Sequence, residues 1–191
     1  MAPSRSLALT CSLFFSVLLS LFVPAPCYAL EAMPPTINVA GKQLVKNGAG
    51  ARTKFVLTIY HAGLYLQKKS KDANTIIAAN QPMAVRLNII SGFANSKKVS
   101  HGINTGFKNS TGGKTAPILT QINQFLAVFK APIKKGDLFE FAYMPGNGTK
   151  VSKNGKGVTV IKGLPFKKAL FGIWLSNRPA QASLKQQMLG G

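Results

Sequence analysis

The stretch that decides the fold lies between Gly48 and Leu66 and reads GAGARTKFVLTIYHAGLYL. Its second half is rich in β-branched and aromatic residues, which favour extended strands with one face against a core. We expect one or two strands from Thr53 to Leu66, bent at Gly63, after a polar, glycine-rich segment at residues 45–50. The fold is therefore expected to rest on a sheet.

Helical and extended patterns both occur in the rest of the chain. Apolar residues at helical spacing predict a helix over residues 118–129, with Pro117 in its first turn. Residues 149–162 predict a hairpin that turns at Asn154-Gly155, a strong hairpin signal. The other expected elements are strands at 83–90 and 139–143 and helices at 73–79, 96–108, 166–175 and 183–189. This order predicts an α+β fold, an antiparallel sheet covered on one face by helices.

Residues 1–29 have the pattern of a secretory signal peptide. One charge, Arg5, precedes an apolar run at residues 13–23, and small residues occupy the −3 and −1 positions before a cut after Ala29. The run is short for a membrane span, and prolines interrupt its end. We therefore expect a signal peptide at 1–29, one domain at 30–191, and an exported protein that is periplasmic or secreted.

The chain is strongly basic. Its 191 residues include 24 Lys and Arg but only 4 Asp and Glu, a formal charge of +20, and loss of Arg5 leaves +19 on the mature chain. Scattered acids, two histidines and no mature cysteine predict no metal, no cofactor and no paired-carboxylate chemistry. The lysines are spread along the chain, Lys167 and Lys168 among them. This favours a solvated cationic surface over a specific nucleic-acid site and leaves weak contact with an anionic surface open.

Arg52 stands apart from the other cations. It follows small residues at 48–51, which let a backbone or a ligand come close, and it opens the most apolar strand region. Tyr60 lies eight residues later, so on an unbroken strand the two side chains share a face. An arginine fork and a phenol on one face suit a carboxylate or an enolate oxygen. The pair is a candidate anion site; the alternative is that Arg52 pairs with an acid or extends into solvent.

Three segments, in this order, resemble the chalcone isomerase-like family, and most closely its exported bacterial branch. They are GAGAR ending at Arg52, IYHAGLYL at residues 59–66 and KALFGIWL at residues 168–175. The resemblance covers nearly the whole mature chain. It implies an open-faced sandwich, in which a large antiparallel sheet lies under a layer of helices and the ligand cleft lies between them.

The resemblance also assigns positions. The ligand-binding arginine of the family falls on Arg52, and Tyr60 stands where true isomerases have threonine and fatty-acid-binding relatives have tyrosine. The catalytic tyrosine of the isomerases falls near residues 95–96, where this chain has none, and their threonine–methionine pair becomes Ile173-Trp174. No catalytic residue is therefore assigned.

These observations lead to one expected function and two alternatives. We expect a monomeric exported domain that binds a fatty acid or a similar small amphipathic carboxylate without catalysis. Arg52 and Tyr60 would hold the head group, and Phe125, Phe129 and Trp174 are candidate walls for the tail. One alternative is an isomerase or intramolecular lyase that acts through an Arg52-stabilised enolate. The other is a binder of an anionic polymer or membrane surface.

Processing at the expected site gives a mature protein that begins at Leu30, because the small residues before the cut satisfy the cleavage rule. N-terminal sequencing of the exported protein checks this prediction. An intact Met1 on a membrane-bound species would contradict it.

Overall fold

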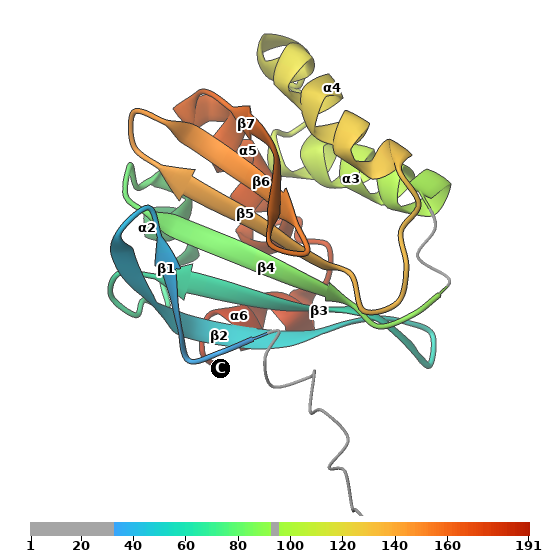
Figure 1. Ribbon diagram of the computed structural model, residues 1–191, viewed down its shortest axis with the longest axis horizontal. Coiled ribbons are helices and arrows are strands. Elements are labelled where there is room, and N and C mark those ends of the chain that lie inside the picture. Colours follow the sequence, from blue (N-terminus) through green and yellow to red (C-terminus); the bar gives the residue numbers. More distant parts are fainter. Residues whose placement is uncertain (1–32, 93–95) are drawn as a thin grey trace, which may run out of the picture.

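Seven strands form one antiparallel sheet whose spatial order follows the chain from β1 to β7 (Figure 1). The computed structural model describes residues 33–92 and 96–191, so the expected signal peptide and Asn95 lie outside the described residues. The strands are β1 Thr36–Val39, β2 Lys42–Lys54, β3 Leu57–Leu66, β4 Met83–Ile89, β5 Leu138–Met144, β6 Gly148–Lys153 and β7 Lys156–Ile161. The helices are α2 Ala73–Ala78, α3 Ser96–Ser110, η1 Ala116–Ile118, α4 Leu119–Ala127, η2 Val128–Lys130, α5 Leu164–Leu175 and α6 Ala182–Met188.

The helices cover one face of the sheet. Along β4, Val85 and Leu87 belong to the large core beneath the helices, and Ala84 belongs to a small cluster on the other face. Along β5, Phe141 and Ala142 divide between the two clusters in the same way. This alternation is what a strand with one heavily buried face requires. The predicted α+β fold, a large antiparallel sheet covered on one face, is confirmed.

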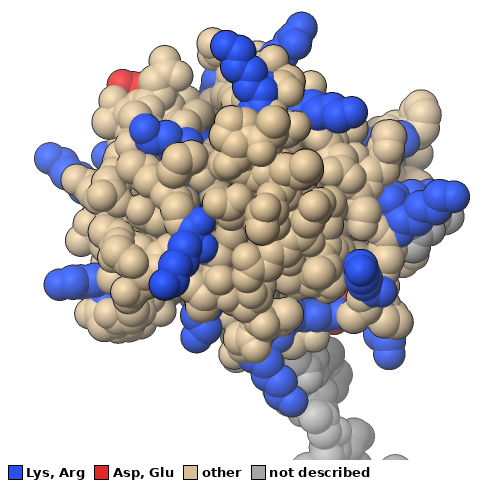
Figure 2. All heavy atoms as spheres, turned by 90° about the horizontal axis from the view of Figure 1, so that it is seen from above, with Lys and Arg blue, Asp and Glu red and all other residues tan. Residues whose placement is uncertain are grey.

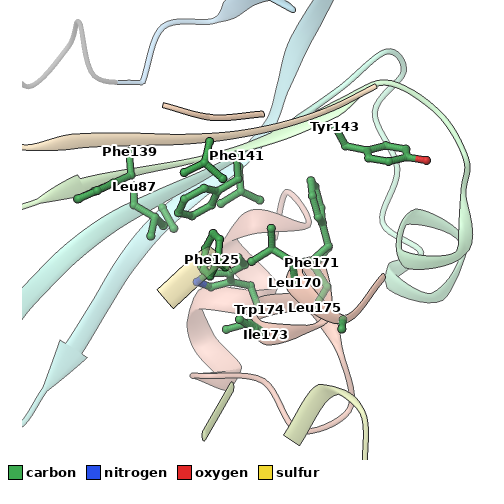
Figure 3. Packing of buried hydrophobic residues seen from close by; sticks show 14 of the residues in the cluster. Leu87, Phe125, Phe139, Phe141, Tyr143, Leu170, Phe171, Ile173, Trp174 and Leu175 are labelled. Carbon is green, nitrogen blue, oxygen red and sulfur yellow. The ribbon is translucent and has the colours of Figure 1, made fainter. Parts of the chain in front are cut away.

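Helix α5 is the centre of the core. Nine of its residues, including Phe166 and Trp174, are buried, and a helix that is apolar nearly all round belongs inside a domain. Its side chains meet aromatic residues from the sheet and from α4 (Figure 3). Phe125 makes edge contacts with Phe141 and Phe166, with ring centroids 5.1 and 5.9 Å apart. The helical layer and the sheet therefore interlock through rings.

The structure corrects the sequence reading of residues 45–66. The chain turns at Phe55-Val56, between β2 and β3, and β3 runs straight through Gly63. A Cβ at Gly63 would overlap the Met33 sulfur, so this glycine makes room for a neighbouring segment and not for a bend. The polar, glycine-rich segment is also strand, because β2 begins at Lys42.

Most of the other expected elements are present within two or three residues of their expected ends. The helix expected at 118–129 is a 3₁₀ turn, α4 and a second 3₁₀ turn in succession, and α3 extends to Ser110. The expected hairpin is present, with Asn154 and Gly155 at φ values of 51° and 77°. None of the helices in the described ranges is long and apolar enough to cross a bilayer.

Lys167 departs from the expected solvated surface. It is fully buried on α5, and its ammonium donates to the carbonyl oxygens of Ile76, Ile77 and Ala79 at 2.9, 3.0 and 2.7 Å. These carbonyls end helix α2, where a positive charge is favourable. Burial, with a smaller effect of the neighbouring Lys168 charge, lowers the pKa of Lys167 to about 8. Lys167 is thus a structural cap that attaches α2 to α5.

Lys167→Met should lower the free energy of unfolding at pH 7 by about 1–3 kcal/mol, because the α2 carbonyls lose their donor. The folded pKa lies below that of an unfolded lysine. Between pH 8 and 10.5 the unfolded chain therefore binds more protons, and wild-type stability should rise relative to the variant. Urea unfolding across this range measures both effects. The exposed neighbour provides the control, since Lys168→Met removes the same charge; equal losses in the two variants would contradict the capping role.

Candidate functional site

Arg52 and Tyr60 lie directly opposite each other in the ladder between β2 and β3. Cross-strand partners point to the same face of a sheet, so the shared face expected from the sequence is observed for a different reason. Tyr60 packs against the core beneath the helices, which places the pair between the sheet and the helical layer. The structure therefore brings these two candidate residues together.

Small residues before Arg52 let helix α6 lie close on β2. A Cβ at Gly48 would overlap the Gln187 carbonyl oxygen, and one at Gly50 would overlap the Gln187 side chain. The Gln187 amide oxygen also accepts from the Ala51 N–H at 3.2 Å. The close approach suggested by the glycines is thus to the backbone and side chains of α6.

The N-cap residue of the same helix, at its other end, supplies a partner for Arg52. The Arg52 guanidinium donates to the Thr53 carbonyl at 2.7 Å and to the Gln181 amide oxygen at 2.9 Å. Gln181 is itself held, because its amide nitrogen donates to the Ser183 hydroxyl at 2.7 Å. The guanidinium is half-buried and oriented by neutral oxygens. Sequence reasoning did not find Gln181, since nothing in the sequence shows that residues 52 and 181 meet.

Arg52 contacts no carboxylate within the described part of the chain. Asp72 caps helix α2, Asp137 pairs with Lys153 at 2.8 Å, and Glu140 pairs with Arg86 at 2.7 Å. Each of these three acids is therefore committed to another partner. The charge of Arg52 is left to attract an external anion.

Tyr60 has its oxygen occupied and its hydrogen available. The Trp174 indole N–H donates to the Tyr60 hydroxyl oxygen at 3.1 Å, and the described residues provide no acceptor for the phenolic hydrogen. Burial raises the pKa of Tyr60, opposed by the Trp174 hydrogen bond and the charge of Arg52. The phenol is therefore protonated at neutral pH and is a donor beside a cation.

The three aromatic candidates form one continuous cluster behind the pair. The Trp174 ring stacks on Phe141 with centroids 6.1 Å apart, and Phe125 contacts both Phe141 and Phe129 at 5.1 and 5.2 Å. Phe125 and Phe129 are 1% and 2% exposed. Trp174 contacts the Arg52–Tyr60 pair through Tyr60, whereas Phe125 and Phe129 connect to it through the rings of Phe141 and Trp174.

An open hollow of about 520 Å³ lies at the end of the sheet where β3 begins. It is lined by Leu57, Thr58, Ile90, Ser91, Gly92 and Lys135, and Thr58 lies two residues before Tyr60 on the same strand. It is open to solvent, and neither Arg52 nor Tyr60 lines it. Sequence reasoning did not bring these residues together, because they come from three separate segments of the chain.

On the face that Figure 2 shows, basic side chains do not form a single patch. Figure 2 shows one face, with Lys and Arg along its outline and few in its centre. Within residues 33–92 and 96–191, no three His, Cys, Asp or Glu side chains come together to hold a metal ion. Among the described residues, the Arg52–Tyr60 pair presents donors suited to an anion, and the hollow lies at the same end of the sheet.

The antiparallel sheet covered on one face by helices agrees with the comparisons with known proteins. A sequence model of the chalcone isomerase-like family matches residues 29–190, so the chain belongs to this family. No curated protein matches the sequence. The crystal structure of a fatty-acid binding protein from Arabidopsis thaliana superposes with a TM-score of 0.65, 15% identity, and coverage of 82% of this chain and 90% of that one. At this identity the likeness concerns the fold.

Gly48→Ala should destabilise the domain by about 1–3 kcal/mol and more than Gly50→Ala does. The new Cβ at position 48 meets α6 backbone, which cannot yield, while at position 50 it meets a flexible side chain. Thermal unfolding measures both. Gly102 has open space around it on α3, so Gly102→Ala should be neutral or stabilising. A Gly48→Ala variant as stable as the wild type would show that α6 does not need this close approach.

Proposed function

We propose that this chalcone isomerase-like domain is exported and binds a fatty acid or a similar small amphipathic carboxylate, with its head group on Arg52 and Tyr60. One observation carries the proposal: among the described residues, the half-buried Arg52 guanidinium has no carboxylate partner, and it lies opposite a phenol whose hydrogen has no acceptor there. Two donors, one of them charged, suit the two oxygens of a carboxylate. The similar Arabidopsis thaliana structure, that of a fatty-acid binding protein, supports the same class of ligand.

The two ends of such a ligand contribute differently to its binding. Burial of ten methylenes contributes about 8 kcal/mol at ~0.8 kcal/mol each. A charge-assisted hydrogen bond contributes about 1.5–3 kcal/mol. The tail therefore sets most of the affinity, and Arg52 sets which end of the ligand lies at the sheet.

The tail has two routes from the head group. The hollow lined by Leu57 and Thr58 receives a tail without moving the core. Phe125 and Phe129 serve as walls only if the ligand separates rings that now pack together. Trp174 borders the head-group end on either route, because it already contacts Tyr60.

A binding function is favoured over an isomerase because this chain lacks hydrogen-bond donors that would stabilise an enolate. An enolate intermediate needs several hydrogen-bond donors, each contributing about 3 kcal/mol to the barrier reduction in oxyanion-type sites. Ile173 has no polar group, and the only N–H of the Trp174 side chain is directed at Tyr60. Turnover of an enone that disappears in Arg52→Ala would instead favour the enzyme.

Arg52→Ala should abolish most fatty-acid binding with little loss of fold stability, because it leaves the carboxylate without its cation. Tyr60→Phe removes one donor and should weaken binding about fivefold. Arg52→Lys should restore part of the affinity, since an ammonium keeps the charge but not the fork. The double variant should lose less than the sum of the two single losses, because both donors address one anion. Calorimetric titration with a medium-chain fatty acid measures the series.

Arg178→Ala is the matched control, because it removes an equal charge from an exposed position. It should bind like the wild type. Unchanged affinity in Arg52→Ala, or a lower melting temperature with binding intact, would make Arg52 a purely structural residue and overturn the proposal.

A further inference from the structure

The turn between β2 and β3 exposes apolar side chains at a costly position. Phe55 and Val56 are 91% and 95% exposed, and Leu57 is 45% exposed. Phe55 has a φ of 55°, in the left-handed region. Two-residue hairpin turns favour Asn-Gly or Asp-Gly because they require positive φ values. A bulky residue with a positive φ stores strain. Neither backbone nor core stability explains a Phe-Val turn, which points to a function of this tip, defined here as residues 54–57.

The same end of the sheet is basic. Antiparallel pairing brings the end of β2 and the start of β5 to one end of the molecule, at the right of Figure 1. Lys54 precedes Phe55, and Lys134 and Lys135 precede β5; all three are exposed. The acid described at this end, Asp137, is buried and pairs with Lys153. The tip therefore exposes apolar side chains, and Lys54, Lys134 and Lys135 form a basic surround near them.

We propose that this tip docks on an anionic lipid bilayer, with Phe55 and Val56 in the head-group region and the lysines on the lipid phosphates. An apolar tip flanked by lysines is the combination that binds membrane surfaces, because insertion and electrostatic attraction add. A second copy of the chain fits less well, since tip-to-tip contact would bring like charges together in a protein of formal charge +19 after signal removal.

Docking in this orientation also places the hollow at the membrane. Leu57 belongs both to the tip and to the wall of the hollow, and Lys135 belongs both to the basic surround and to that wall. The hollow thus lies at the docked end of the molecule. The docking itself needs no ligand on Arg52, so it can be tested independently of the proposed function.

Co-sedimentation of the processed protein with vesicles tests the docking. Vesicles of equal parts phosphatidylglycerol and phosphatidylcholine should bind it, pure phosphatidylcholine should bind it at least tenfold less, and binding should weaken as salt rises. Val56→Asp should reduce binding more than tenfold. Val158 on β7 is also exposed, at 51%, and Val158→Asp makes the same change in charge away from the tip. It should reduce binding by no more than about fivefold, the effect of one charge near the surface.

A fluorescent label reports the orientation. The processed chain has no cysteine, so Val56→Cys and Asn147→Cys each provide a single labelling site. A nitrobenzoxadiazole label at position 56 should brighten on the anionic vesicles, while one at position 147, in the turn between β5 and β6, should not. Arg52→Ala should bind vesicles like the wild type even if it has lost fatty acid.

Three outcomes would overturn the docking. The first is no binding to anionic vesicles, and the second is equal losses in Val56→Asp and Val158→Asp, which would show non-specific attraction to the whole surface. The third is self-association that Val56→Asp abolishes while vesicle binding is unchanged, as measured by sedimentation velocity. That result would make a second copy the occupant of the tip.

Discussion

The rest of the structure depends on the burial of helix α5 against the sheet. Its residues supply the rings that meet Phe125 and Phe141, the lysine that holds α2, and the indole that holds Tyr60. Because close-packed interiors transmit displacement, moving this helix would alter the core, the attachment of α2 and the candidate site at once. The helix is a structural element and at the same time one wall of the site.

The few acids of the chain explain why the candidate site is available. Asp72, Asp137 and Glu140 all serve local structure, as a helix cap or as partners of other cations. Arg52 is instead positioned by carbonyl and amide oxygens, which orient the guanidinium without neutralising it. An arginine held in this way keeps its attraction for anions, whereas an arginine in an ion pair does not. The basic composition and the site are therefore connected.

Sequence patterns predicted the elements that follow from local apolar periodicity or from turn residues. β4, β5 and the hairpin turn at Asn154-Gly155 follow from alternation and turn chemistry, and α4 follows from helical spacing. The β2–β3 turn was not predictable, because Phe55-Val56 reads as a continuation of a strand and violates the usual turn preference. The glycine-rich half of β2 has few β-forming residues, since it accommodates α6.

The candidate site was predictable only in part, for a related reason. Arg52 and Tyr60 stood out through residue type, scarcity of acids and family resemblance. Gln181 and the lining of the hollow did not, because tertiary structure alone brings them to the pair. Burial of Lys167 was equally hidden, since its carbonyl partners are some ninety residues away.

The sheet topology has a consequence for the order of assembly. Every ladder joins strands that are consecutive in the chain, but β4 and β5 are separated by residues 90–137, which carry α3 and α4. Closing that loop costs about 3 kcal/mol more in chain entropy than closing a two-residue turn. The connection between the four-stranded and three-stranded parts of the sheet is therefore its costliest loop closure. Bringing α3 and α4 onto the sheet is thus coupled to joining its two parts.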